Sequence, residues 1–298
     1  MLSLYECRGD SLVRLGNLIK EGKGPFETLG RVYVSVRDDN TLLLAPSGYT
    51  RNFYITSTDP DSLLDKRTWK TFSYPPTDSY LSMPSPVGQE GCLLPSLSVN
   101  ADKINMFDRF SFGDSIYTLI YSPYPENDTK AENGAQSQVY DVRLYRRPNS
   151  DRYVYITYME EQVCIFDLRN DSVVNRNYLY DEQPKFEMAS DGLNVSYDKD
   201  NTLGFLADIS PKYIYLMKKL IKLGDLGVIP DYKGYPLGYS DVVLVFDWNG
   251  KPIRRFILDT PVATIGADRT DRYIYGSTID LETDRQRIVR FALPSLEH

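Results

Sequence analysis

The stretch 241–294 constrains the fold most strongly, because it alternates short apolar runs with polar turns. An apolar run ending at Phe246 leads through Trp248 into Asn249-Gly250, and the run 253–258 returns. Asn-Gly favours two successive residues with positive φ, so we expect a tight antiparallel hairpin here. Three more short runs follow, separated by polar turns and without helical periodicity. This pattern predicts an antiparallel all-β fold.

Groups of short strands recur along the rest of the chain. Residues 2–7 and 11–20 form a predicted hairpin, and four strands joined by tight turns are expected between residues 31 and 75. Four such strands make one sheet of a β-propeller. Successive groups begin near residues 30, 93, 139, 203 and 262. These groups and the leading hairpin predict one propeller domain over residues 1–295, with five to six blades.

An internal repeat supports this reading. Residues 162–179 and 242–258 both read as strand, Phe-Asp, polar turn and strand. The stretches 76–91 and 123–137 are predicted loops. Residues 212–217 are predicted as a strand followed by a long insertion to Tyr239, with one or two helical turns within 212–226 as the alternative.

Composition excludes several function classes. The net charge is −7 and the basic residues are scattered, which argues against nucleic-acid binding. No apolar run approaches the ~20 residues of a membrane-spanning helix. The 24 tyrosines favour half-buried sheet surfaces over a role in stacking on a ligand.

Few residues with site chemistry are present. The closing Leu-Glu-His (296–298) is typical of a purification tag, and His298 is the only histidine, which argues against Ser-His catalysis and histidine metal sites. Cys7, Cys92 and Cys164 are too far apart for a zinc site. Asp198 begins a calcium-like motif that lacks the glycine and the last acidic ligand, so an Asp-rich turn is favoured. We expect no catalytic residue, metal or cofactor.

Two segments resemble a known family. They are the loop Gly-Lys-Gly-Pro-Phe-Glu (22–27) and the closing pattern VLVFDWNGKPIRRFILDTPVATIGADRTDRYIYG. Both resemble TolB-like six-bladed β-propeller proteins, which are abundant in Bacteroides and its relatives. The family's loop usually reads Gly-x-Gly-Pro-Gly-Glu, so Phe26 replaces its last glycine. The resemblance implies an exported protein, often a lipoprotein. It also implies a truncated or internal start and an incomplete first blade, because the family's signal region and the first strands of its first blade are missing here.

Loops on one rim of such a propeller are the expected binding surface. By this logic residues 21–29, 76–91, 181–192 and 220–239 converge, and the candidate contacts are Lys23, Glu27, Tyr80, Tyr232 and Tyr235. The alternative for 22–27 is a turn that the chain needs to enter the sheet. Asp108 and Arg109 interrupt an apolar strand. They are predicted to face the central channel, with a salt-bridged core pair as the alternative.

Three functions remain open from the sequence. The first is a non-enzymatic exported propeller, periplasmic or outer-membrane-associated, that binds a protein, peptide or glycan through its rim. The second is a carbohydrate-active or lactone-type hydrolase that uses channel carboxylates and a metal. The third is a scaffold within an envelope complex.

Overall fold

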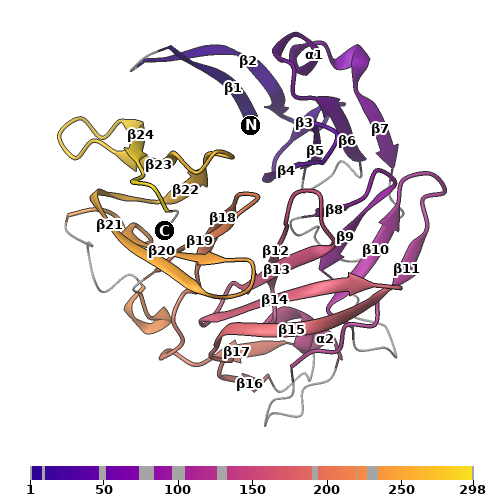
Figure 1. Cartoon of the computed structure of the whole chain (residues 1–298), viewed down its shortest axis with the longest axis vertical. Helices are drawn as coiled ribbons and strands as arrows, with labels where there is room; N and C mark the ends of the chain where they lie inside the picture. Colours follow the sequence, from indigo (N-terminus) through magenta and orange to yellow (C-terminus); the bar gives the residue numbers. More distant parts are fainter. Residues whose placement is uncertain are drawn as a thin grey trace. The chain divides into compact units, whose positions relative to one another are not determined.

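The computed structural model describes residues 2–8, 11–46, 52–73, 84–95, 105–125, 133–189, 194–219, 221–226 and 234–296. The chain divides into two compact units, Met1–Ser122 and Pro123–His298 (Figure 1). Each unit is described by itself below. The single domain expected over residues 1–295 therefore stays a prediction.

The first unit contains three sheets. The first sheet consists of β1 (Leu2–Arg8), β2 (Ser11–Glu21) and β3 (Glu27–Thr28). The second consists of β4 (Val32–Val36), β5 (Thr41–Pro46), β6 (Asn52–Ser57) and β7 (Lys70–Ser73), with helix α1 (Pro60–Leu64) and the 3-10 turn η1 (Lys66–Thr68) between its last two strands. The third consists of β8 (Ser85–Val87), β9 (Gly91–Pro95), β10 (Phe107–Ser111) and β11 (Tyr117–Leu119).

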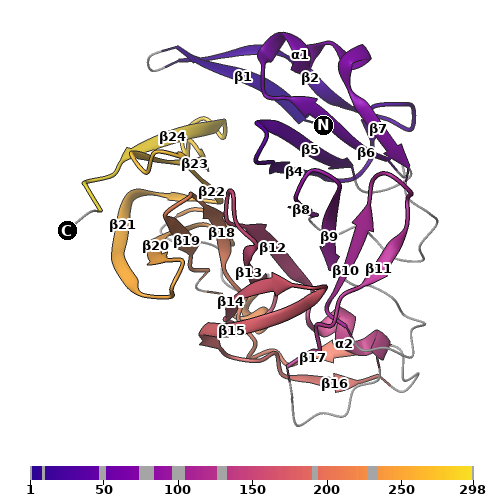
Figure 2. The same ribbon diagram turned by 45° about the vertical axis from the view of Figure 1, so that its right-hand side comes forward.

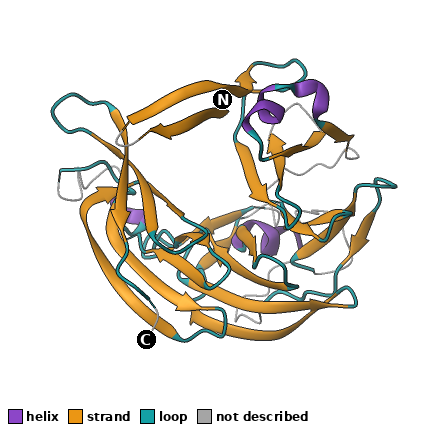
Figure 3. Cartoon of the chain, turned by 45° about the horizontal axis from the view of Figure 1, so that its top comes forward, coloured by secondary structure: helices purple, strands orange, loops and turns teal. Residues whose placement is uncertain are grey.

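The second unit starts with helix α2 (Asn133–Val139) and continues almost entirely as strands (Figure 3). Its sheets comprise β12 (Val142–Arg146), β13 (Arg152–Thr157), β14 (Gln162–Arg169) and β15 (Ser172–Asp181); β16 (Phe186–Met188) and β17 (Val195–Tyr197); β18 (Leu206–Ile209), β19 (Tyr213–Met217), β20 (Ser240–Asp247) and β21 (Pro252–Val262); and β22 (Thr264–Ala267), β23 (Tyr273–Ile279) and β24 (Gln286–Ala292). The 3-10 turn η2 (Leu223–Asp225) lies between β19 and β20.

Each four-stranded sheet is an antiparallel meander in which strands adjacent in sequence are also neighbours in space. This is the organisation of a propeller blade and confirms the all-β prediction. Within the described residues the first sheet has three strands, and its last strand has only two residues, as expected for an incomplete first blade. The last sheet also has three strands.

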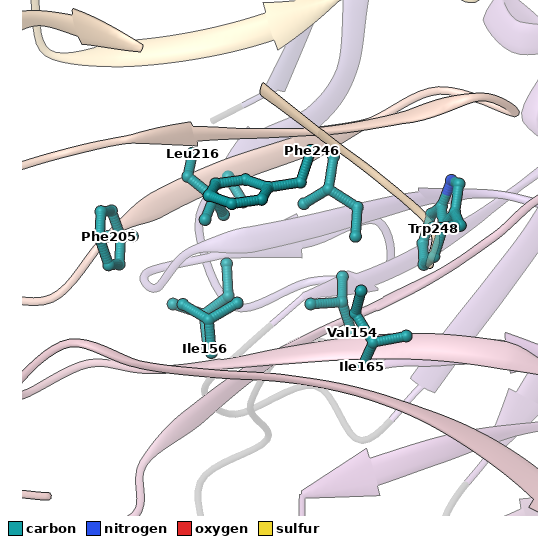
Figure 4. Close-up of a cluster of buried hydrophobic side chains, with 10 residues drawn as sticks. Val154, Ile156, Ile165, Phe205, Leu216, Phe246 and Trp248 are labelled. Atoms are coloured by element: carbon teal, nitrogen blue, oxygen red, sulfur yellow. The ribbon is translucent and has the colours of Figure 1, made fainter. Parts of the chain in front are cut away.

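Apolar cores lie between consecutive sheets within each unit. In the second unit Val154, Ile156 and Ile165 face side chains from the next sheet, and Figure 4 shows Phe246 and Trp248 among them. The sheets β12–β15, β18–β21 and β22–β24 follow one another in this way (Figure 2). Strand side chains alternate between the two faces of a sheet, so a sheet with two apolar faces needs a neighbour on each.

Leu296 takes part in the last of these cores. It was set aside as part of a tag on sequence grounds, but its side chain is buried with residues of β19 to β24. Its origin aside, this leucine contributes to packing in the structure.

The hairpin turn at Asn249-Gly250 differs from the prediction. Only Gly250 has a positive φ, of 87°. The Oδ1 of Asp247 accepts hydrogen bonds from the backbone N–H groups of Asn249 and Lys251, both at 2.8 Å. This carboxylate fixes a longer turn, with a bulge in the strand pairing beside it.

The two successive positive-φ residues occur instead at the matching place in the repeat. Asn170 and Asp171 have φ values of 48° and 53° and connect Arg169 to Ser172, which pair directly. The repeat itself is therefore confirmed, but its two turns are built differently.

Two predicted loops and one connection between predicted strands contain secondary structure. The stretch 123–137 includes most of α2, and 76–91 includes β8. The segment after Ser57 forms α1, because Asp59 accepts a hydrogen bond from the Ser62 N–H at 3.0 Å and Pro60 occupies the first turn. The strand expected at 212–217 is confirmed as β19.

A buried ion pair connects two sheets of the second unit. Asp167 is 7% exposed and accepts from Arg152 Nε at 2.7 Å and from Asn175 Nδ2 at 2.9 Å. Arg152 also donates to the carbonyl of Trp248 in the neighbouring sheet, at 3.1 Å. Hydrogen bonds from Arg152 lower the pKa of Asp167.

We expect Asp167→Ala to lower the free energy of unfolding by about 2–3 kcal/mol, because it leaves the partly buried guanidinium of Arg152 without its carboxylate. Asp247→Ala is the matched control from the repeat. Its carboxylate holds only its own turn, so a loss of about 1 kcal/mol is expected. Urea unfolding at pH 7 measures both, and equal losses would contradict the inter-sheet role.

The same pair predicts a pH dependence. A lowered folded-state pKa stabilises the protein above the ordinary Asp pKa, and this contribution is lost as the pH falls through the folded value. The deficit of Asp167→Ala should therefore shrink at low pH.

Candidate binding surface

Several connections of the second unit meet at one end of its sheets. We call the described residues of 158–161, 182–205, 218–239 and 280–285 the loop surface. Met159 bridges to Leu203, and Thr202 bridges to Lys222, as isolated β-pairs. The first three of these connections therefore form one continuous backbone layer.

Asn201 fixes this layer from inside. It is fully buried, accepts from the Lys185 N–H at 2.8 Å and donates to the Lys185 carbonyl at 2.6 Å. Its own carbonyl accepts from the Leu223 N–H at 2.7 Å. The predicted loops 181–192 and 220–239 thus share a surface in their described parts.

Ionic groups of the loop surface are largely engaged with one another. Lys218 Nζ lies 2.7 Å from Glu161, and Lys222 Nζ lies 3.0 Å from Asp200. Asp198 accepts from the Asp200 N–H at 2.8 Å, which is the Asp-rich turn that the sequence favoured. Among the described residues, no group of three or more His, Cys, Asp or Glu is placed to hold a metal ion.

Tyr235, one of the predicted contacts, lies beside a second tyrosine. The ring centroids of Tyr235 and Tyr239 are 5.6 Å apart with an interplanar angle of 30°. Leu281, which is 51% exposed, lies near Gly234 on the adjacent β23–β24 turn. Burial and the nearby Asp284 raise the pKa of Tyr239. We call Tyr235, Tyr239 and Leu281 the tyrosine patch.

The structure of the loop 22–27 shows why its sequence contains two glycines and a glutamate. The Glu27 carboxylate folds back and accepts from the Gly24 N–H at 2.8 Å. A side chain at Gly22, whose φ is 151°, would overlap that carboxylate. The motif therefore builds a turn, and Glu27 holds it, whereas the side chain of Lys23 is exposed.

Phe26, which stands where the family's loop usually has glycine, adopts a backbone conformation that favours glycine. Its φ is 58°, in the left-handed region that disfavours residues with a side chain. Its ring lies 4.9 Å from that of Tyr54 and 5.4 Å from that of Trp69, and Lys66 Nζ lies 5.2 Å from its centroid. Aromatic packing offsets the backbone cost.

Asp108 and Arg109, the predicted channel residues, are neighbours on one strand. Both are on β10, the third strand of its sheet and not the first. Asp108 lies opposite Leu94 and Leu119 across the sheet. Side chains of adjacent strand residues point to opposite faces of the sheet, so a role of either residue in the channel stays a prediction. Two further predicted contacts, Tyr80 and Tyr232, lie outside the described residues.

The sequence analysis missed Asp208, on the first strand of its sheet. Its carboxylate accepts from the Ala267 N–H of the next first strand at 2.6 Å and from its own neighbour Ile209. Burial raises its pKa. The hydroxyl of Tyr145, on the first strand β12, accepts from the backbone of Ala207, and burial raises the pKa of Tyr145 to about 12. A single aspartate inside Phe-Leu-Ala-Asp-Ile was the available signal.

Comparison with known proteins identifies the family. The model of the TolB-like 6-blade propeller-like family matches residues 11–270. The chain belongs to this family. The match runs from β2 to just beyond β22 and confirms the six-bladed propeller fold that the sequence predicted. No curated protein is significantly similar to the chain in sequence.

Solved structures are similar to this TolB-like chain at a low level. Raptor from Chaetomium thermophilum is 10% identical over 89% of this chain, with a TM-score of 0.48, and the match spans only 19% of Raptor. The Myceliophteria thermophila Cps50 (Swd1) beta-propeller domain is 9% identical over 88% of this chain and 84% of its own length, with a TM-score of 0.44. A chain of a mitotic checkpoint complex is 9% identical over 97% and 82%, with a TM-score of 0.48.

We expect Phe26→Gly to be more stable than Phe26→Ala by about 1 kcal/mol, the reverse of the usual order, because only glycine relieves the positive φ. Both variants should be less stable than the natural sequence, since the ring contacts are lost. Thermal or urea unfolding of the three proteins measures the order. A more stable alanine variant would contradict the left-handed conformation.

We expect Asp208→Asn to gain stability relative to the natural sequence as the pH rises from about 4 to 7. Because the pKa of Asp208 is raised in the folded state, the natural protein loses stability as the pH rises toward that folded-state pKa. Asparagine does not titrate, so the variant does not have this loss. Asp167→Asn is the control with the opposite sign, because the pKa of Asp167 is lowered. Urea unfolding across this pH range gives both slopes, and slopes of the same sign would refute the assignment.

Proposed function

We propose that this chain is an exported, non-enzymatic β-propeller that binds a protein, peptide or glycan partner through its loop surface. The observation that carries the proposal is the tyrosine patch. Two half-buried tyrosine rings and an exposed leucine lie together on connections of the loop surface.

Tyrosine suits this role physically. Its ring supplies a large contact area with few rotatable bonds, and its hydroxyl reaches water or a polar partner. Rings of this kind are enriched in protein interfaces and also stack on sugars through their apolar faces. The buried Asn201 network places the neighbouring loops without using the surface side chains.

The proposed location is the periplasm or the outer-membrane surface, with attachment through a lipid anchor. Membership of the TolB-like family, which is associated with the periplasm, supports it. No helix in the described ranges has the length and apolar character to cross a membrane. Lys23 stays a proposed contact, whereas the Glu27 carboxylate is occupied by its own loop.

We expect the double change Tyr235→Ala with Tyr239→Ala to weaken partner binding at least about tenfold, which is the effect typical of central aromatic contacts. Partners would be sought on a glycan array and in envelope extracts, then purified for measurement of Kd. Tyr121→Ala is the control, because it removes a tyrosine that is 68% exposed in the other unit. An unchanged Kd in the double variant with a confirmed partner would contradict the proposal.

Asp208 favours one second candidate, a carbohydrate-active or lactone-type hydrolase. A buried carboxyl with a raised pKa suits a general acid. Its two backbone hydrogen bonds supply a structural reason for the same burial. Hydrolysis of a glycan or lactone panel that disappears in Asp208→Asn, with the fold intact, would establish this candidate in place of the first.

A further inference from the structure

Arg143 stands apart among the half-buried arginines of the second unit. It lies on β12, and its guanidinium carbon is 5.5 Å from the ring centroid of Tyr158, which is 37% exposed on the loop surface. Within the described residues Arg143 forms no ion pair with a carboxylate and no side-chain hydrogen bond. The tyrosine ring is the group that holds it.

Neighbouring arginines are satisfied in other ways. Arg146 lies 3.6 Å from Asp151, and Arg152 lies 2.7 Å from Asp167. Arg147 donates to the Pro211 carbonyl at 3.1 Å, and Arg176 donates to the Pro123 carbonyl at 2.6 Å. The chain has 41 acidic and 34 basic residues, so acidic partners are plentiful. The lack of a carboxylate partner for Arg143 in the described part of the chain is therefore not explained by a shortage of acidic residues.

Asp208, on the first strand of the next four-stranded sheet, does not form an ion pair with Arg143. The carboxylate of Asp208 is engaged by the Ala267 and Ile209 N–H groups. Glu161 of the loop surface is already bound to Lys218. The guanidinium group of Arg143 thus lies beside an exposed aromatic ring without a carboxylate among the described residues to neutralise its charge.

We propose that Arg143 and Tyr158 form a binding site for a carboxylate group, carried by a peptide or an acidic sugar. The planar guanidinium matches the two oxygens of a carboxylate, and a half-buried position strengthens that bond. Phosphate sites usually gather several cations or backbone donors, whereas one cation is presented here. The inference rests on the proposed function and names the chemistry that the loop surface recognises.

Trifluoroacetate is a suitable carboxylate probe, followed by fluorine NMR during titration with the full chain at constant ionic strength. We expect a saturable shift with a Kd in the millimolar range for the natural sequence. Arg143→Gln should raise this Kd about tenfold or more, the scale of a lost charged hydrogen bond. Arg147→Gln, the matched control, should leave it unchanged, and Arg143→Lys should lie between them.

Each outcome decides the proposal. A Kd that is the same in Arg143→Gln, or the absence of saturation, overturns it. Tighter displacement by inorganic phosphate than by acetate also overturns it, because the site would then select phosphate. If Arg143→Gln melts early, Tyr158→Leu removes the stacking partner and should weaken trifluoroacetate binding as well.

Binding of the partner separates this inference from the proposed function. If the tyrosine-patch variant loses the partner and Arg143→Gln keeps it with unchanged Kd, the binding function stands and the carboxylate site fails. If both variants keep the partner, both proposals fail.

Discussion

Packing of one sheet face against the next is the constraint on which the rest of this structure depends. Trp248 illustrates it, since the side chain is 2% exposed between two sheets of the second unit. Its indole N–H donates to the Ser210 carbonyl at 3.0 Å, so the large ring is buried without losing a hydrogen bond. The Arg152 guanidinium then binds the Trp248 carbonyl and Asp167 together.

Polar contacts define how neighbouring sheets meet, and apolar area supplies most of the driving force. Asp208 is a second polar contact of this kind. It lies on β18, the first strand of its sheet, and its carboxylate accepts a hydrogen bond from the Ala267 N–H on the first strand of the next sheet. First strands lie at sheet edges and present unpaired backbone donors, which side chains must satisfy. An acidic group buried for this purpose acquires a raised pKa as a consequence of its position.

The loop surface follows from this arrangement. Connections between the second and third strands bury a few side chains, such as those of Met159 and Ile221, and leave others available to a partner. Backbone pairs such as Met159 with Leu203, and the buried Asn201, hold these connections in place. The exposed ring of Tyr158 is therefore presented on an ordered base, which lowers the entropy lost on binding.

The sequence by itself determined the all-β class, the position of most strands, the Phe-Asp repeat and the family. Each of these rests on local alternation of apolar residues or on turn residues, which act over a few positions. Tertiary structure decided how Asn249-Gly250 turns, because the Asp247 carboxylate holds it. It also placed Asp108 on a third strand and brought Arg143 beside Tyr158. Such neighbours are set by register and by packing between distant segments, and no local pattern encodes them.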